Sequence, residues 1–412
     1  MTFDNLYIER PRYQKLLESY KGTPSVKVLQ GVRRCGKSTL LDIYRKSLLD
    51  GGVEDRNVFC RKLDSLAVGL DVTAETLLDD FTRFYALADS NLPVYVFLDE
   101  IQEVDGWEKV VRKLRAQPGV DVYVTGSNAD VLSRELATLL AGRCTTLDVH
   151  PLSFAEYLEF WKARRGALDS VDEAFAYYLR YGGMPGLFYV PEGEEFWRRE
   201  LRGIYESVLL KDVALRCAVR DMVALDRLAR YVLMMGGNLF STRKVASALA
   251  ASGLKVSPST VDGYLDALAK AYLVYPCMQE GLAGKKVLAP QRKFYAVDSG
   301  LTGLARDFRA RDTGYALEGA VHMELVRRGY SVAVGTLLAG EVDFVARRHD
   351  ETVYVQVSQT ILAEETYARE VEPLEAIRDS FPKVIITLDR VGLGTTKTGI
   401  KIVNAVDWMR AG

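Results

Sequence analysis

Short apolar runs alternate with amphipathic segments in the N-terminal third of the chain. The run at 25–30 (SVKVLQ) is rich in β-forming residues, and residues 37–49 repeat apolar side chains at helical spacing. The run at 94–102 (VYVFLDEIQ) begins with five mostly apolar residues, which suits a central parallel strand covered on both faces. A third strand is expected at 120–128 (VDVYVTGSN). These alternations predict an α/β fold built on a parallel sheet.

The turn between the first strand and the first helix has the spacing of a phosphate-binding loop. Gly31 is followed by four residues and then by Gly36, Lys37 and Ser38. Glycines let the backbone curl so that N–H groups face phosphate oxygens, and the helix N-terminus adds its positive dipole end. Lys37 supplies a positive charge to the β- and γ-phosphates, and the Ser38 hydroxyl is a ligand for Mg²⁺. The sequence therefore predicts ATP and Mg²⁺ as cofactors.

Two adjacent carboxylates follow the apolar run of the second strand. Asp99 is expected to hold the magnesium ion through water, and Glu100 to polarise the attacking water. Because a general base is useful only when water attacks, Glu100 favours hydrolysis over passive nucleotide binding. The protein is therefore predicted to be an ATPase.

Polar residues after the third strand are further candidates. Ser127 and Asn128 are residue types that commonly start helices, but here either side chain can also contact the γ-phosphate or orient the water. Arg143 is expected in a loop before a short strand, where an arginine can reach a neighbouring subunit's phosphates as a finger or form a surface salt bridge. The sequence leaves open which role Arg143 takes, and with it whether the protein forms a homo-oligomer.

Four motifs together resemble a known family. The stretches GVRRCGKSTLL (31–41), FLDEIQ (97–102), VTGSN (124–128) and LAGR…HPLSFAEYL (140–158) are similar to those of prokaryotic AAA+ superfamily ATPases. These ATPases carry a C-terminal domain of unknown function with a restriction-nuclease-like fold. The resemblance covers nearly the whole chain and implies that the loop arginines, which recur in the family, belong to the site.

The expected site residues fall into three sets. The nucleotide-binding set is Gly31, Arg33, Arg34, Gly36, Lys37, Ser38, Thr39 and Ser127. The catalytic set is Glu100, Asn128 and Arg143, with Arg143 as the candidate finger. The metal ligands are Ser38 and Asp99.

The middle of the chain is expected to be mostly helical. The resemblance implies that residues 153–230 form a helical lid over the nucleotide. The segment 181–190 (YGGMPGLFYV) interrupts the helical pattern with glycines and a proline, and is either a hinge or a long loop.

Residues 238–275 have the pattern of a winged helix. Helices are expected at 242–251 and 259–270, and an apolar run then begins a strand. If the unit binds DNA, the second helix enters a major groove and nearby cations meet the phosphates, namely Arg243, Lys244, Lys285 and Lys286. Winged helices also serve as protein interfaces, and the acids Asp262 and Asp266 repel phosphate. DNA therefore remains an open candidate partner.

The C-terminal region has the pattern of a restriction-type nuclease. An amphipathic helix at 316–330 precedes strand-like runs at 341–348, 352–358 and 383–389. In such nucleases an acid on the helix, an aspartate on one strand and Glu-x-Lys on the next strand converge on Mg²⁺.

The nuclease pattern is incomplete in this chain. Glu318 and Asp343 match it, but Gln356-Val357-Ser358 stands where Glu-x-Lys is expected. A neutral glutamine removes a charge from the metal site, and a serine cannot place a cation beside the nucleophile. We therefore expect nuclease activity to be lost and the domain to be kept for docking DNA or a partner.

Composition limits the other function classes. The 412 residues include 48% apolar and 26% charged residues, as in globular proteins, and the net charge of −1 gives no overall attraction to nucleic acid or membrane. The chain shows neither an uninterrupted apolar run of ~18 residues nor a signal peptide, so we expect no membrane partner and a cytoplasmic location. The five cysteines and three histidines show no metal-binding spacing.

The predicted organisation has four parts. They are a P-loop ATPase core (1–152), a helical lid (153–230), a winged helix (231–290) and a degenerate nuclease-like domain (291–412). The leading hypothesis is an AAA+ ATPase that couples its nucleotide state to a DNA- or protein-binding C-terminal module. The alternatives are an ATP-regulated, Mg²⁺-dependent DNA nuclease and a nucleotide-switched signalling or scaffold protein.

Overall fold

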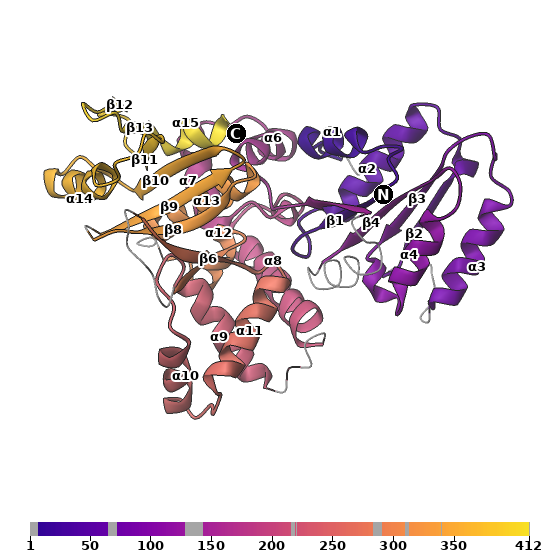
Figure 1. Ribbon diagram of the computed structural model, residues 1–412, viewed down its shortest axis with the longest axis horizontal. Helices are drawn as coiled ribbons and strands as arrows, with labels where there is room; N and C mark the ends of the chain where they lie inside the picture. The colour runs from indigo at the N-terminus through magenta and orange to yellow at the C-terminus, as the bar shows by residue number, and fades with distance from the viewer. Residues whose placement is uncertain are drawn as a thin grey trace. The chain divides into compact units, whose positions relative to one another are not determined.

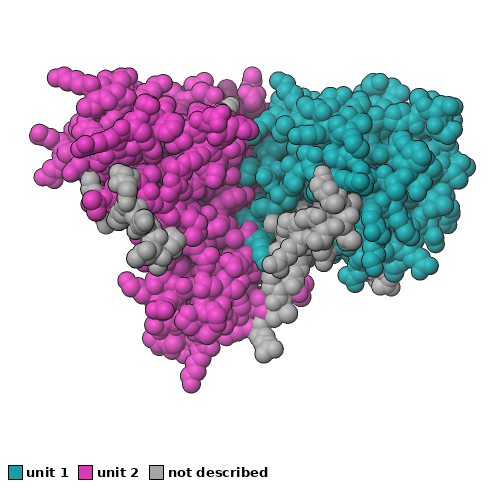
Figure 2. All heavy atoms as spheres, in the orientation of Figure 1, with its two compact units in different colours: residues 1–150, 270–272 teal, residues 151–269, 273–412 magenta. Residues whose placement is uncertain are grey.

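The protein divides into two compact units, shown as a ribbon in Figure 1 and as spheres in Figure 2. Unit 1 comprises residues 1–150 and 270–272, and unit 2 comprises residues 151–269 and 273–412. The structure is a computed structural model. It describes residues 7–64, 72–127, 143–215, 219, 221–282, 291–309, 313–338 and 340–411.

Unit 1 is built on a five-stranded parallel sheet, as the sequence predicts. The strand order is β2 (Val58–Lys62), β3 (Val94–Asp99), β4 (Val120–Gly126), β1 (Val26–Gln30) and β5 (Cys144–Asp148). Strand β4 lies between β1 and β3, with Leu29 of β1 opposite Thr125 and Leu98 of β3 opposite Val124. The carboxyl ends of these three strands therefore meet at one edge of the sheet.

Helices cover the sheet of unit 1 on both faces (Figure 1). They are α1 (Pro11–Ser19), α2 (Lys37–Asp50), α3 (Ala74–Tyr85) and α4 (Trp107–Arg115). Phe97 and Tyr123 stack with their ring centroids 5.0 Å apart and meet Tyr44 of α2. The alternate residues of the same strands, including Val96 and Val124, join the core formed with α3 and α4. All six residues of β3 are buried, which confirms the expected central strand.

Unit 2 begins with helices, which confirms the helical pattern expected after residue 153. They are α6 (Phe154–Arg165), α7 (Val171–Tyr181), α8 (Glu194–Ser207), α9 (Met222–Met234), α10 (Thr242–Ala251) and α11 (Pro258–Lys270). A 3₁₀-helix (Pro185–Phe188) lies between α7 and α8, and a π-helical segment (Val208–Ala214) continues α8. Helices α10 and α11 match the two predicted at 242–251 and 259–270 to within a residue.

The glycine-rich segment after α7 is a fixed turn. The backbone N–H of Gly183 donates to Asp298 Oδ2 at 2.7 Å, and that of Gly300 donates to Asp298 Oδ1 at 2.9 Å. Gly182 has a φ of 83°, and a Cβ there would lie 1.8 Å from Asp298 Oδ1. The turn therefore requires a glycine at position 182 and is closed by a buried carboxylate.

An eight-stranded sheet forms the rest of unit 2 (Figure 1). Its order is β12 (Gly394–Thr395), β13 (Lys401–Asn404), β11 (Lys383–Thr387), β10 (Glu351–Ser358), β9 (Glu341–Arg348), β8 (Ser331–Thr336), β6 (Val274–Gly281) and β7 (Arg292–Ala296). Strands β8, β9 and β10 are antiparallel neighbours, whereas β11 runs parallel to β10 and to β13. The helices of this part are α12 (Ser299–Ala305), α13 (Thr313–Arg327), α14 (Glu364–Glu375) and α15 (Ala405–Arg410).

The strands predicted for the C-terminal region correspond to β9, β10 and β11. The amphipathic helix predicted just before them is α13, which begins three residues earlier than expected. Among the described residues, the structure contains no helix with the length and apolarity needed to cross a bilayer.

Candidate functional site

The loop at 31–36 joins β1 to α2 at the carboxyl edge of the parallel sheet. Gly31 and Gly36 have φ values of 149° and 102°, and Arg34 also has a positive φ, 65°. A Cβ on Gly31 would lie 2.0 Å from the carbonyl oxygen of Val149, so a larger residue does not fit. The loop is thus curled by the two glycines that the sequence pattern singles out.

Lys37 is the first residue of α2 and its side chain turns back into the loop. Its Nζ donates to the carbonyl oxygens of Gly31 at 2.9 Å and of Val32 at 3.1 Å, and the residue is buried. The ammonium therefore lies inside the curled backbone, beside the N-terminus of α2, where positive charge from the helix dipole adds to its own.

A chain of hydrogen bonds connects the loop with the ends of β3 and β4. Ser38 Oγ donates to Asp99 Oδ1 at 2.9 Å, and Thr125 Oγ1 donates to the same oxygen at 2.6 Å. Thr125 Oγ1 in turn accepts from the backbone N–H of Glu100 at 2.8 Å. The structure thus brings Ser38, Asp99 and Glu100 together, and Thr125 connects them.

Glu100 has a strained backbone at this edge. Its φ of 54° and ψ of 49° lie in the left-handed region, which a non-glycine residue rarely adopts. Its carboxylate is buried and accepts a hydrogen bond from Gln102 Nε2. Strain of this kind is common at functional sites, where the surroundings hold a residue in an unfavourable conformation.

Ser38 and Asp99 suit Mg²⁺ as neighbouring ligands. Their oxygens lie 2.9 Å apart, so a Mg²⁺ ion bound by the Ser38 hydroxyl would also be within reach of Asp99 through a water molecule. Burial raises the pKa of Asp99, and the hydrogen bonds from Thr125 and Ser38 oppose that rise. Hydroxyl and carboxylate oxygens are the ligand types that Mg²⁺ prefers, so the residues present fit the metal ion expected from the sequence.

The other expected ligands occupy different positions around the loop. Arg33 is half-buried and Arg34 exposed in the loop itself, and Thr39 lies half-buried in the first turn of α2. Ser127 is fully buried just after β4. Asn128 lies outside the described residues, so its proposed catalytic role stays a prediction.

Arg143 lies at the opposite edge of the sheet from the loop. Its carbonyl oxygen accepts from the backbone N–H of Val26 at the start of β1, and Cys144 pairs with Val26. The loop begins after Gln30, at the other end of β1, about 13 Å away at ~3.3 Å per residue. The exposed Arg143 side chain is therefore remote from the loop of its own chain.

Two residues at the site were missed by the sequence analysis. Thr125 lies within β4, two residues before Ser127, and only its register opposite β3 singles it out. Arg10 donates to the carbonyl oxygens of Cys35 at 3.2 Å and of His150 at 3.0 Å, and so supports the loop from outside. Its position 21 residues before the loop gave no signal.

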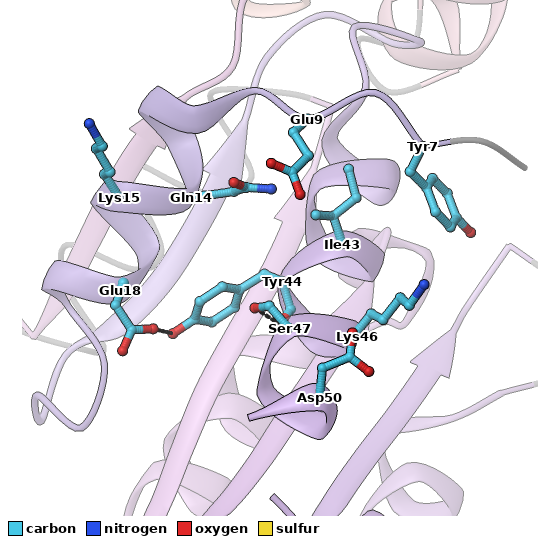
Figure 3. Close-up of a pocket in the computed structure, with 10 residues that line it drawn as sticks. All are labelled: Tyr7, Glu9, Gln14, Lys15, Glu18, Ile43, Tyr44, Lys46, Ser47 and Asp50. Carbon is cyan, nitrogen blue, oxygen red and sulfur yellow. Dashed lines mark hydrogen bonds between the residues drawn. The ribbon is translucent and has the colours of Figure 1, made fainter. Parts of the chain in front are cut away.

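A separate hollow of about 570 Å³ in unit 1 lies along α1 and α2 (Figure 3). Tyr44 crosses the hollow and donates to Glu18 at 3.1 Å. Lys46 and Asp50 line the hollow at the C-terminal end of α2. None of the expected nucleotide ligands lines this hollow, so it is distinct from the phosphate-binding loop.

The residues of the nuclease pattern also lie together in unit 2. Asp343 Oδ2 accepts from the backbone N–H of Val357 at 2.8 Å, and Gln356 Oε1 accepts from that of Asp343 at 3.1 Å. Gln356 Nε2 donates to the buried Glu370 at 2.7 Å.

Ser358 Oγ donates to the carbonyl oxygen of Thr360, away from these acids. Glu318 of α13 accepts from the Tyr295 hydroxyl at 2.7 Å.

The parallel sheet and its loop define the class of the N-terminal unit as a P-loop AAA domain. The family model described as "AAA domain" matches residues 23–158, and a model described as "Domain of unknown function (DUF8612)" matches residues 172–312. The Walker-type ATPase of Pyrococcus abyssi shares the fold, with a TM-score of 0.52 and 18% identity, covering 74% of this chain and 97% of that one.

Similarity to two curated proteins extends beyond the AAA domain. An uncharacterized protein of Haemophilus influenzae is 36% identical over 407 residues, 98% of each chain, and this chain belongs to its family. A protein of Methanocaldococcus jannaschii is 29% identical over 317 residues, covering 74% of this chain and 67% of that protein.

Proposed function

We propose that the protein binds and hydrolyses ATP at the loop of unit 1. The observation that carries the proposal is the hydrogen-bonded chain from Ser38 through Asp99 and Thr125 to Glu100, beside the buried ammonium of Lys37. Ser38 and Asp99 would hold Mg²⁺, which would supply positive charge to the phosphates. Lys37 would bind the phosphate oxygens, and Glu100 would take a proton from the attacking water.

Two substitutions separate binding from hydrolysis. Lys37→Ala removes the charge inside the loop, so nucleotide affinity is expected to be lost in a calorimetric titration with ATP and Mg²⁺. Glu100→Gln keeps the size of the side chain but removes the base, so ATP is expected to bind and remain uncleaved. Unchanged turnover in Glu100→Gln, or unchanged ATP affinity in Lys37→Ala, contradicts the proposal.

The segment from α9 to β7 is proposed to be a winged helix. Its elements follow in the order α9, a single antiparallel bridge between Phe240 and Arg292, α10, α11, β6 and β7. The order supports three helices closed by a small antiparallel sheet in which Phe240, β7 and β6 are the strands.

The acids on α11 are less repulsive than their charges suggest. Arg292 of β7 pairs with Asp262 at 2.7 Å and with Asp266 at 3.4 Å. The net negative charge of this face is thereby reduced, and Arg243 and Lys244 of the preceding helix α10 are exposed. Lys285 and Lys286 lie outside the described residues. Because Arg292 neutralises part of the acidic charge, α11 repels phosphate less, and this pairing supports DNA as a partner.

DNA binding is tested by fluorescence anisotropy with labelled duplex, branched and single-stranded DNA at ~50 mM salt. The pair Arg243→Ala and Lys244→Ala is expected to weaken binding and to lower the dependence on salt. ATP turnover is measured with and without the same DNA. A protein that turns over slowly and binds no DNA at low salt is instead the nucleotide-switched scaffold.

The C-terminal part is proposed to have a restriction-nuclease-like fold without cutting activity. The run of α13, β8, β9, β10, α14 and β11, with three antiparallel strands followed by one parallel strand, supports that fold. The alternative, an ATP-regulated nuclease, predicts DNA cleavage with Mg²⁺ that Asp343→Ala abolishes. The absence of cleavage by the wild-type protein with ATP and Mg²⁺ would exclude it.

A further inference from the structure

Lys293 of β7 lies among the acids of the nuclease pattern. Its Nζ forms an ion pair with Glu341 and lies 3.7 Å from Glu318 Oε1. Asp343 is a third acid close enough to act on Lys293, and burial and the charge of Glu318 raise its own pKa well above the usual value. We call Glu318, Glu341 and Asp343 the carboxylate cluster. Lys293 is almost completely buried, so its charge is compensated inside the protein and not by solvent.

The surroundings keep Lys293 charged. Its ammonium pairs with Glu341 and lies 3.7 Å from Glu318 Oε1, so carboxylate oxygens take the place of water around the charge. The side chain is therefore an ammonium ion at neutral pH, and it is a permanent cation at the position where the acids gather.

The oxygens of the cluster already have partners within the protein. Glu318 Oε1 already accepts from Tyr295, and a Cβ on Gly237 would lie 2.8 Å from Glu318 Oε2. Asp343 Oδ2 accepts from the backbone N–H of Val357. Mg²⁺ keeps several of its waters when it binds protein. Among the described residues, no group of three or more His, Cys, Asp or Glu side chains is placed to hold a metal ion.

We infer that the ammonium of Lys293 is the resident cation of the carboxylate cluster and takes the place that the nuclease resemblance gives to a metal ion. The residues of this cluster thus do not fit Mg²⁺, in contrast to Ser38 and Asp99 in unit 1. The nuclease pattern has a catalytic lysine where this chain has Ser358. Lys293 does not take over its catalytic role, because Lys293 is buried and bound to two of the acids. The cluster instead holds β7, α13 and β9 together by charge.

The stability test compares Lys293→Met with Lys255→Met in the full chain. Lys255 is exposed on the segment before α11, so the same substitution there is a matched control. Removing Lys293 leaves half-buried carboxylates without their counter-ion, and we expect the calorimetric melting temperature of unit 2 to fall by roughly 5–10 °C. Lys255→Met is expected to melt as the wild type does. Equal melting of the two variants overturns the inference.

A second substitution identifies the charge as the cause. Adding Glu318→Gln to Lys293→Met removes one of the stranded acids, so part of the lost melting temperature is expected to return. If Lys293 contributed only by packing, the second substitution would not restore the melting temperature. A double variant that is less stable than Lys293→Met contradicts the inference.

The metal test does not require any change at Lys293. In the nucleotide-free Ser38→Ala, Asp99→Asn protein the loop site is removed, and free Mn²⁺ is followed by electron paramagnetic resonance. We expect no stoichiometric Mn²⁺ binding. Binding of one Mn²⁺ that is lost when Asp343→Asn is added overturns the inference. Because the loop site is absent from this protein, the outcome is independent of whether the chain hydrolyses ATP.

Discussion

At the scale of single residues, the site depends on register as much as on motif. Spacing alone predicted Lys37, Ser38, Asp99 and Glu100, because each belongs to a short pattern with a chemical reason. Thr125 was not separated from its polar neighbours, because its contact with Asp99 arises only when β4 pairs beside β3. A sequence shows which residues end a strand but not which of them lies opposite the next strand's acid.

Thr125→Val tests this connection. The substitution keeps the shape of the side chain but removes the hydroxyl that binds Asp99 and the backbone N–H of Glu100. Because Glu100 is then held less firmly, kcat is expected to fall roughly 10- to 100-fold while ATP affinity changes little. Thr82→Val, an exposed position on α3, is the control in the same steady-state ATPase assay. A change confined to KM would place Thr125 in binding instead.

At the scale of elements, helix and strand positions follow from periodicity, but long-range closures do not. The pattern located α10, α11, β9 and β10 to within a residue, since each carries its own apolar repeat. It left the segment at 181–190 undecided between hinge and loop. The segment is a fixed turn because both oxygens of Asp298 accept hydrogen bonds there, and Asp298 lies more than a hundred residues further along the chain. Lys293 was missed for the same reason, because it reaches the acids only through the pairing of β7 with β6.

Gly182→Ala tests the closed turn. The new Cβ would meet Asp298 Oδ1 at 1.8 Å, in addition to the cost of a φ of 83°, so unfolding free energy is expected to fall by about 3 kcal/mol or more. Gly166→Ala has a similar φ of 92° and ψ of −151° with nothing within 4 Å of its Cβ, so only the backbone cost of about 1–3 kcal/mol applies. If both variants lose the same free energy of unfolding in denaturant, the contact with Asp298 does not contribute to the cost.

The same carboxylate predicts a pH dependence. Burial raises the pKa of Asp298 to about 6, against the hydrogen bonds from Gly183 and Gly300 and the charge of Arg327. Between about pH 4 and 6 the folded state therefore binds a proton that the unfolded state has lost, and stability falls as pH rises through this window. The loss amounts to at most about 3 kcal/mol.

Asp298→Asn removes this titration. The unfolding free energy of the wild type minus that of Asp298→Asn is expected to decrease from pH 4 to pH 6.5 and then to become constant. Chemical denaturation at intervals across that range measures the difference, in which the titrations common to both proteins cancel. A difference that rises with pH would mean that Asp298 is ionised more easily in the folded protein.

At the scale of the whole molecule, one expected residue is placed where its own chain cannot use it. Arg143 lies at the amino edge of the parallel sheet, whereas the loop, Asp99 and Glu100 lie at the carboxyl edge. Both readings left open by the sequence, a finger and a surface ion pair, agree with this position. If Arg143 is a finger, the phosphates that it contacts belong to a second copy of the chain, so the complete site requires an oligomer.

Mixing two inactive variants tests this arrangement. Arg143→Ala is expected to lower kcat on the order of 10³-fold without weakening ATP binding, and Lys37→Ala to bind no ATP. In a mixed oligomer, a Lys37→Ala subunit supplies Arg143 to the intact loop of an Arg143→Ala subunit, so turnover is expected to return when the two are combined. The same mixture made with Lys37→Ala, Arg143→Ala supplies no arginine and is the control. A mixture that stays inactive, or an Arg143→Ala protein with full turnover, leaves the arginine as a surface residue.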